Sequence, residues 1–114
     1  MKEGNKLSEV GGAIEDIANA NKLGIVREYG GHGVGHSMHE DPFVFNYRTP
    51  PGEKFILKSG MTIAIEPMLN LGGDAVYTEE DKWTVSTKDG KPSAHFEHTI
   101  LVGETQGEIL TVLS

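Results

Sequence analysis

The first residues of this 114-residue sequence that could carry chemistry are the histidines of one short segment. His32, His36, His39 and Glu40 lie within nine residues. A helical zinc motif needs the order His-Glu-x-x-His, but here the acid comes last and the neighbouring glycines oppose a helix. If the segment is extended, His32 and His36 lie on one face and His39 on the other, so a single site would need a turn. For one histidine taken alone, a surface or hydrogen-bonded role is the simpler interpretation.

Two carboxylates, Glu66 and Glu97, form the second candidate group, because each lies in an apolar, strand-like stretch. The local pattern fits a solvent-facing side chain equally well. If both faced inward, they would repel each other and bind protons unless a cation lay between them. One imidazole with two carboxylates suits Mn, Fe, Co or Zn, and a metal-held water could then support hydrolysis.

An amphipathic helix and several antiparallel strands must position these residues. Apolar residues at helical spacing predict a helix that ends before Gly24. The pair Gly11-Gly12 lowers its intrinsic stability by about 1 kcal/mol each relative to Ala, so packing should hold it. The helical positions are Leu7, Val10, Ile14 and Ile17.

The remainder of the sequence predicts short strands separated by turns. The cluster Pro50-Pro51-Gly52 is expected to be a turn, and Pro67 should end the strand before it. The turn at residues 88–91 predicts a hairpin between its flanking strands. Strands are expected at 43–47, 55–57, 61–66, 83–87, 93–102 and 109–113. One helix followed by such strands predicts an α+β fold in a single domain over residues 1–114.

Composition excludes several classes of function. The net charge is -7 and the ten basic residues are scattered, which argues against a nucleic-acid partner. No apolar run approaches the roughly 20 residues that span a bilayer, and residues 1–4 lack a signal-peptide core. We therefore expect no membrane partner and a cytoplasmic location. The chain has no Cys, which removes disulfide and thiolate chemistry.

Three motifs in this order resemble type I methionine aminopeptidase. They are Gly31-His32-Gly33-Val34-Gly35 with His39-Glu40-x-Pro42, then Ile65-Glu66-Pro67-Met68, then Phe96-Glu97-His98-Thr99-Ile100. Aminopeptidase P and prolidase share the Gly-His-Gly and Glu-Pro elements, but Met68 and the Phe-Glu-His-Thr run are typical of the methionine-specific branch. The resemblance implies the carboxyl-terminal half of a pita-bread fold, with one amphipathic helix followed by a mainly antiparallel sheet.

The resemblance also implies roles for single residues. His32 and Glu66 would bind one divalent metal ion, and Glu97 would bridge it to a second. Glu66 would also accept a proton during catalysis, and His39 would contact the substrate.

Three further positions concern the substrate pocket. Met38 stands where the family often has Phe, and His36 where Arg is common, so both could alter the pocket rim. Trp83 resembles a residue near the methionine pocket, although core packing explains a lone Trp equally well.

The family's remaining ligands, two aspartates, and a further catalytic histidine belong to an amino-terminal half, and residues 1–24 supply none of them. The complete enzyme would use two ions of Co, Mn, Fe or Zn to remove the N-terminal methionine of nascent proteins. From this chain alone we expect at most one weak metal site and little or no activity. Its partners would be a peptide with an N-terminal Met and either the missing half or a second copy in a homodimer. A non-catalytic pita-bread module that binds a partner is the alternative, but the retained ligands and His39 favour an enzymatic origin.

Overall fold

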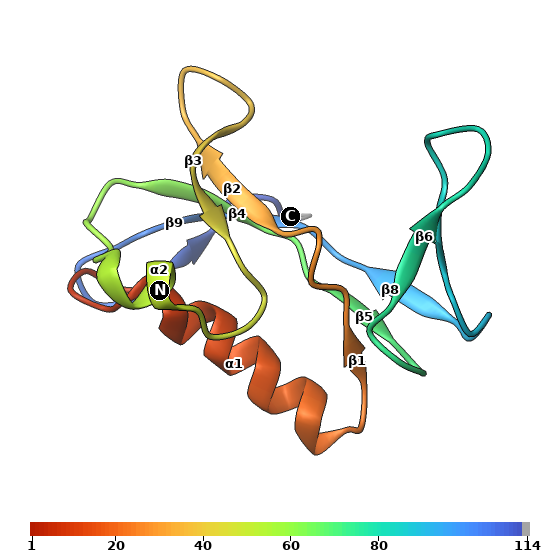
Figure 1. Ribbon diagram of the computed structural model, residues 1–114. Coiled ribbons are helices and arrows are strands. Elements are labelled where there is room, and N and C mark those ends of the chain that lie inside the picture. The colour runs from red at the N-terminus through yellow and green to blue at the C-terminus, as the bar shows by residue number, and fades with distance from the viewer. Residues whose placement is uncertain (113–114) are drawn as a thin grey trace.

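Two helices and ten short strands make up residues 1–112, the part of the protein that a computed structural model describes (Figure 1). Within these residues, neither helix is long and apolar enough to cross a membrane. The elements in chain order are α1 (Leu7–Ala20), β1 (Gly24–Ile25), β2 (Gly31–Val34), β3 (Glu40–Val44), α2 (Pro50–Lys54), β4 (Thr62–Ile65), β5 (Met68–Asn70), β6 (Val76–Thr78), β7 (Val85–Thr87), β8 (Ser93–His95), β9 (His98–Leu101) and β10 (Glu108–Ile109).

The expected amphipathic helix forms as α1. At its start the Glu9 carboxylate accepts a hydrogen bond from the Lys6 backbone N–H at 3.1 Å, which satisfies one of the free donors of the first turn. Its most buried side carries small residues, including Gly11 and Ala18, whereas Ile17 is 61% exposed. The helix therefore packs through close backbone approach more than through its apolar stripe.

A second helix, α2, forms where the sequence predicted only a turn. Two prolines occupy its first positions, where their fixed φ suits a helix start and their missing N–H is not needed. The Thr49 hydroxyl oxygen accepts a hydrogen bond from the Gly52 backbone N–H at 3.1 Å and caps this end. The prediction of a turn at this position was therefore wrong.

The larger sheet has five antiparallel strands in the order β10-β9-β4-β2-β3. Strand β4, predicted from its alternating apolar residues, lies in the middle, with Ile63 between Gly33 of β2 and Ile100 of β9. The last expected strand forms in part, as β10 next to β9, but Leu113 lies outside the described residues.

One end of the molecule carries a smaller sheet, β1-β5-β8, and the separate β6-β7 ribbon (Figure 1). The prediction that residues 83–87 and 93–102 form a hairpin is wrong, because β7 pairs with β6 while β8 pairs with β5. The turn between them exists, but the Asp89 carboxylate accepts hydrogen bonds from the backbone N–H groups of Gly73 and Lys91. The bond from Gly73 ties the turn to the chain after β5, and the two arms diverge.

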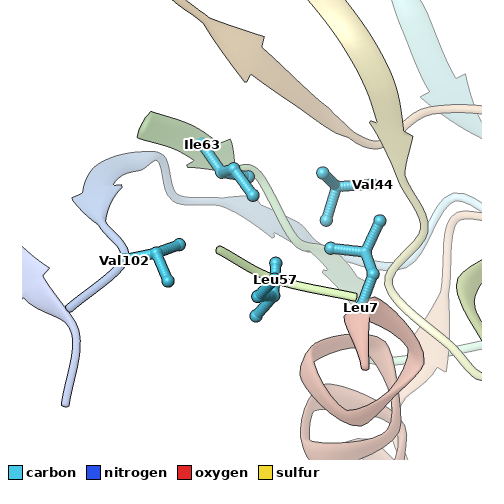
Figure 2. Close-up of a cluster of buried hydrophobic side chains, with 5 residues drawn as sticks. All are labelled: Leu7, Val44, Leu57, Ile63 and Val102. Carbon is cyan, nitrogen blue, oxygen red and sulfur yellow. The ribbon is translucent and has the colours of Figure 1, made fainter. Parts of the chain in front are cut away.

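The hydrophobic core lies between α1 and the five-stranded sheet (Figure 2). Its side chains converge from α1, from two strands, from the loop after α2 and from the residue that follows β9, and each is at most 4% exposed. The cluster consists of Leu7, Val44, Leu57, Ile63 and Val102.

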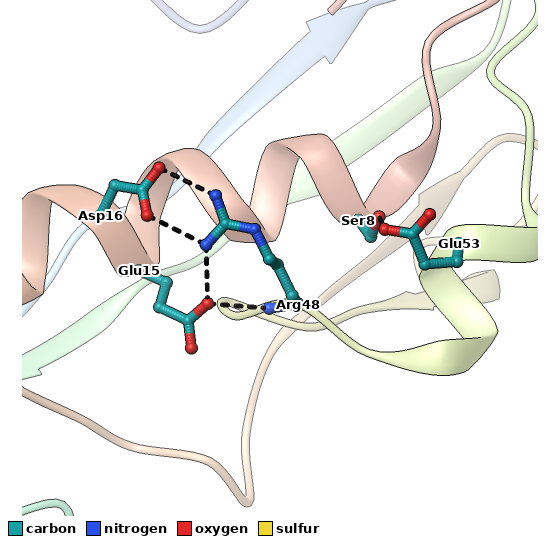
Figure 3. Close-up of polar contacts among 5 residues, drawn as sticks. All are labelled: Ser8, Glu15, Asp16, Arg48 and Glu53. Atoms are coloured by element: carbon teal, nitrogen blue, oxygen red, sulfur yellow. Dashed lines mark hydrogen bonds and ion pairs between the residues drawn. The ribbon is translucent and has the colours of Figure 1, made fainter.

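Polar contacts hold α1 both to the loop after β3 and to α2 (Figure 3). The Arg48 guanidinium donates to Glu15 and Asp16 of α1 at 2.8 to 2.9 Å. The Ser8 hydroxyl of α1 donates to the Glu53 carboxylate of α2 at 2.6 Å. Because Arg48 fixes α1 to the segment between β3 and α2, the helix also supports this segment.

Candidate metal centre

The three expected ligand residues come from three strands that lie side by side. His32 belongs to β2, Glu66 follows directly after β4, and Glu97 directly precedes β9. Strand β4 lies between the other two, and His32 pairs across to Ala64 of β4. A Cβ at Gly31, next to His32, would run into the Ala64 carbonyl, so only glycine allows this close strand approach.

Both glutamates occupy the place where the chain crosses from the larger sheet to the smaller one. Ile65 pairs with His98 in the larger sheet, and Met68 pairs with His95 in the smaller sheet. The two residues between these pairs on each strand, 66–67 and 96–97, interrupt the ladder. The interruption turns side chains that are distant in sequence toward one point.

The side chains of His32, Glu66 and Glu97 converge at this interruption. Their ligand atoms all lie within 4.8 Å of one another, and the His32 Nε2 atom is 3.2 Å from Glu66 Oε1. The His32 and Glu66 side chains are 12% and 16% exposed, whereas Glu97 is exposed. Within residues 1–112 this is the one group of three such side chains close enough to share a metal ion.

The protonation chemistry of this group favours a cation. The His32 Nδ1 atom lies 2.9 Å from the Gly33 carbonyl, which can only accept, so Nδ1 carries the proton and Nε2 points at Glu66. Burial and the neighbouring Glu97 carboxylate raise the pKa of Glu66 above its ordinary value. Acceptor atoms therefore face one another and need protons between them. A divalent ion would replace those protons, and nitrogen and carboxylate oxygen are donors that Mn, Fe, Co and Zn accept.

His39 reaches the same place by way of a turn. The chain reverses between β2 and β3, and the His39 ring packs on the His32 ring with centroids 4.2 Å apart. Together with Glu40, Asp41 and Phe43, the two rings line an open hollow of about 450 Å³. An extended chain would place His32 and His36 on the same face. The reversal instead brings His39 to His32, and His36 lies exposed in the turn.

Two of the three positions expected at the substrate pocket, Met38 and Trp83, lie away from the hollow. Met38 is 75% exposed in the turn after β2, and Trp83 is 87% exposed beside the β6-β7 ribbon. Neither is among the residues that line the hollow at His32. The exposure of Trp83 contradicts the alternative that it packs in the core.

Asn46 belongs to none of the sequence motifs, but it contacts the backbone of Glu66 at the site. Its side chain is fully buried, and its Nδ2 group donates a hydrogen bond to the backbone carbonyl of Glu66 at 3.3 Å. The signal was present as a polar residue between Phe45 and Tyr47 in an otherwise apolar stretch. Such a residue is either solvent-facing or bonded inside, and the local pattern does not decide between the two.

Known proteins of one family match this chain in sequence and in fold. The sequence profile of metallopeptidase family M24 matches residues 1–104. The chain is 50% identical over 110 residues to methionine aminopeptidase 1 of Bacillus subtilis (strain 168), covering 96% of this chain and 44% of that protein. It is 46% identical over 112 residues to methionine aminopeptidase of Salmonella typhimurium, covering 98% of this chain and 42% of that protein.

A crystal structure of methionine aminopeptidase from Thermotoga maritima has the same fold over nearly the whole chain. The TM-score is 0.92 at 47% identity, and the match covers 97% of this chain and 44% of that one. The chain thus spans less than half the length of the relatives it matches. The likeness confirms the predicted resemblance and the predicted fold, an α+β half of a pita-bread fold.

Proposed function

Because the chain belongs to metallopeptidase family M24, we propose that it provides metal-binding and catalytic residues of a methionine aminopeptidase, which removes the N-terminal methionine of nascent proteins. The observation that carries the proposal is the convergence of His32, Glu66 and Glu97 within 4.8 Å. A binding module without chemistry has no physical need for one imidazole and two carboxylates aimed at a shared point.

His32 Nε2 and the carboxylates of Glu66 and Glu97 would hold a divalent ion of Mn, Fe, Co or Zn. When bound, the ion would supply Lewis-acid polarisation of the scissile carbonyl and a nucleophile at neutral pH. The Gly33 carbonyl keeps the His32 ring in the tautomer whose Nε2 lone pair faces the site. The Glu66 carboxylate would accept the proton released during attack.

His39 would bind and orient the peptide. Its ring lies against His32 at the hollow and is exposed, so an N-terminal Met peptide that binds in this hollow would contact it. An imidazole N–H donating to the scissile carbonyl would fix its orientation and stabilise charge that develops on its oxygen. Met38 and Trp83 would contribute to the methionine pocket only if surfaces beyond residues 1–112 enclose them.

One weak metal site and little or no turnover are our expectation for the 114-residue chain. Three ligands can hold one ion, whereas a second ion would share Glu97 alone, which is too few for a stable site. Isothermal titration with Mn or Co tests the binding, and methionine release from a short Met peptide tests the activity. Absence of binding in wild type would refute the proposed metal site, and robust turnover would refute the ligand count.

Association should accompany this function. Large apolar side chains remain exposed on the smaller sheet and beside the site, including Leu71 at 61% and Phe96 at 70%. Such surface is typical of an interface, and we propose that it receives the remaining part of the enzyme or a second copy of this chain as a homodimer. We further propose one domain over residues 1–114 and a cytoplasmic location, where nascent proteins are processed. Light scattering at high concentration tests self-association, and a clean monomer would contradict the homodimer.

A further inference from the structure

Asn46 is buried beside the metal-site residues but belongs to none of the motifs. Its side chain is 0% exposed, and it lies two residues beyond the end of β3. Its Nδ2 group donates to the Glu66 backbone carbonyl at 3.3 Å, while its Oδ1 atom has no hydrogen-bond partner within residues 1–112. Burying an amide whose oxygen has no hydrogen-bond partner costs free energy. Any stabilisation from the Asn46 side-chain amide therefore comes from the one hydrogen bond that it makes.

In the described part of the chain, the backbone carbonyl of Glu66 receives no hydrogen bond from strand pairing, because it lies where the ladder between strands is interrupted. The ladder is interrupted after the Ile65 pair, and it resumes at Met68. The next residue, Pro67, has no N–H, and its carbonyl takes the Phe96 N–H at 3.2 Å. Among the described residues, the Asn46 amide is the donor that reaches the carbonyl of Glu66.

We propose that Asn46 is a positioning residue for the metal centre. Its amide holds the backbone at Glu66 where β4 has ended, and this sets the direction in which the Glu66 carboxylate leaves the chain toward His32 and Glu97. Strand pairing fixes the backbone up to Ile65, and at the next residue, Glu66, the Asn46 side chain takes over this role. The inference rests on the proposed metal-binding function of these three residues.

A matched pair of variants separates positioning from general stability. Asn70 is also 0% exposed, also donates to a backbone carbonyl, that of Gly73 at 2.9 Å, and also has an unbonded Oδ1 atom. Leu has nearly the shape of Asn but no donor, so Asn46→Leu and Asn70→Leu remove the same kind of bond. In Mn titrations of the 114-residue chain, Asn46→Leu should weaken binding by roughly tenfold or more. Asn70→Leu should leave the Kd within about twofold of wild type, because it has no contact with the cluster.

A second measurement uses no metal. In the metal-free chain, Asn46→Leu should move the carbonyl ¹³C resonance of Glu66 and the ring ¹⁵N resonances of His32, whereas Asn70→Leu should leave them in place. If the Leu variants do not fold, Asn46→Ser and Asn70→Ser serve in their place, because Ser is too short to reach the carbonyl. Equal effects of the two substitutions, or unmoved Glu66 and His32 signals in the Asn46 variant, would overturn the inference. A wild-type chain that binds no Mn would refute the proposed function, and the NMR comparison would still decide the role of Asn46.

Discussion

Two adjacent glycines of α1 should respond in opposite ways to replacement by alanine. A Cβ at Gly11 would lie 2.5 Å from the backbone oxygen of Tyr47 and 2.7 Å from that of Phe45. Backbone atoms cannot rotate aside, so the helix or the segment after β3 must shift. A Cβ at Gly12 would meet the end of the Arg48 side chain at 2.9 Å, and a flexible side chain can turn away.

The difference in unfolding free energy between the two variants depends on two effects, and the first is the same in both variants. Replacing Gly by Ala inside a helix stabilises it by about 1 kcal/mol at either position. Overpacking against fixed atoms costs about 1–3 kcal/mol and applies at Gly11 alone. We therefore expect Gly11→Ala to be less stable than Gly12→Ala by about 1–3 kcal/mol, with Gly12→Ala at or above the stability of wild type.

Urea denaturation followed by circular dichroism measures this difference, and a common m value for both variants would show that the unfolding transition is unchanged. In a thermal scan the two midpoints should differ by about 4 °C for each kcal/mol. Arg48→Met in both backgrounds removes the ion pairs with Glu15 and Asp16 and controls for displacement of the guanidinium. If Gly11→Ala proved as stable as Gly12→Ala, the close approach of α1 to this segment would be refuted.

Two further predictions concern the site and the helix contact. His32→Ala and Glu66→Gln should weaken Mn binding by more than the roughly 10–100-fold expected for a supporting residue, whereas His39→Ala, which packs on His32 outside the ligand group, should leave the calorimetric Kd unchanged. The Ser8 hydroxyl donates a hydrogen bond to Glu53 and lowers the pKa of this carboxyl group in the folded protein. The ionised carboxylate therefore stabilises the fold at pH values above the ordinary pKa of Glu. This stabilisation is lost as the pH falls through the lowered pKa of Glu53. Glu53→Gln should therefore flatten the acid side of the profile of unfolding free energy against pH, and an unaltered slope would contradict the contact.

The candidate ligand residues could be chosen from the sequence only because three motifs occur together. Local pattern left Glu66 and Glu97 equally consistent with solvent-facing side chains. What turns them to one point is the interruption between the Ile65 and Met68 pairs, which depends on strands far apart in sequence. Periodicity describes one strand at a time, so it could not reveal that both acids lie at the crossing of two sheets.

Of the two errors in the predicted fold, one has the same long-range origin and the other is local. The arms around Asp89 look like a hairpin locally, but the Asp89 carboxylate binds the Gly73 N–H across sixteen positions and each arm joins another strand. At Pro50 the error was local, because two prolines were taken as a turn although they also suit the first turn of a helix. The capping Thr49 immediately before them was the signal that could have corrected it.

Three consecutive residues connect the packing of α1 with the geometry of the proposed metal centre. Gly11 lies against the carbonyls of Phe45 and Tyr47, and the residue between them, Asn46, holds the backbone of Glu66. A Cβ at Gly11 pushes on the segment that carries Asn46, so it should lengthen or break that hydrogen bond. Gly11→Ala should then weaken Mn binding even under conditions where the protein stays fully folded, while Gly12→Ala should not. If Gly11→Ala lowered the unfolding free energy but left the Kd for Mn unchanged, helix packing and ligand direction would be independent, and Asn46 would not connect them.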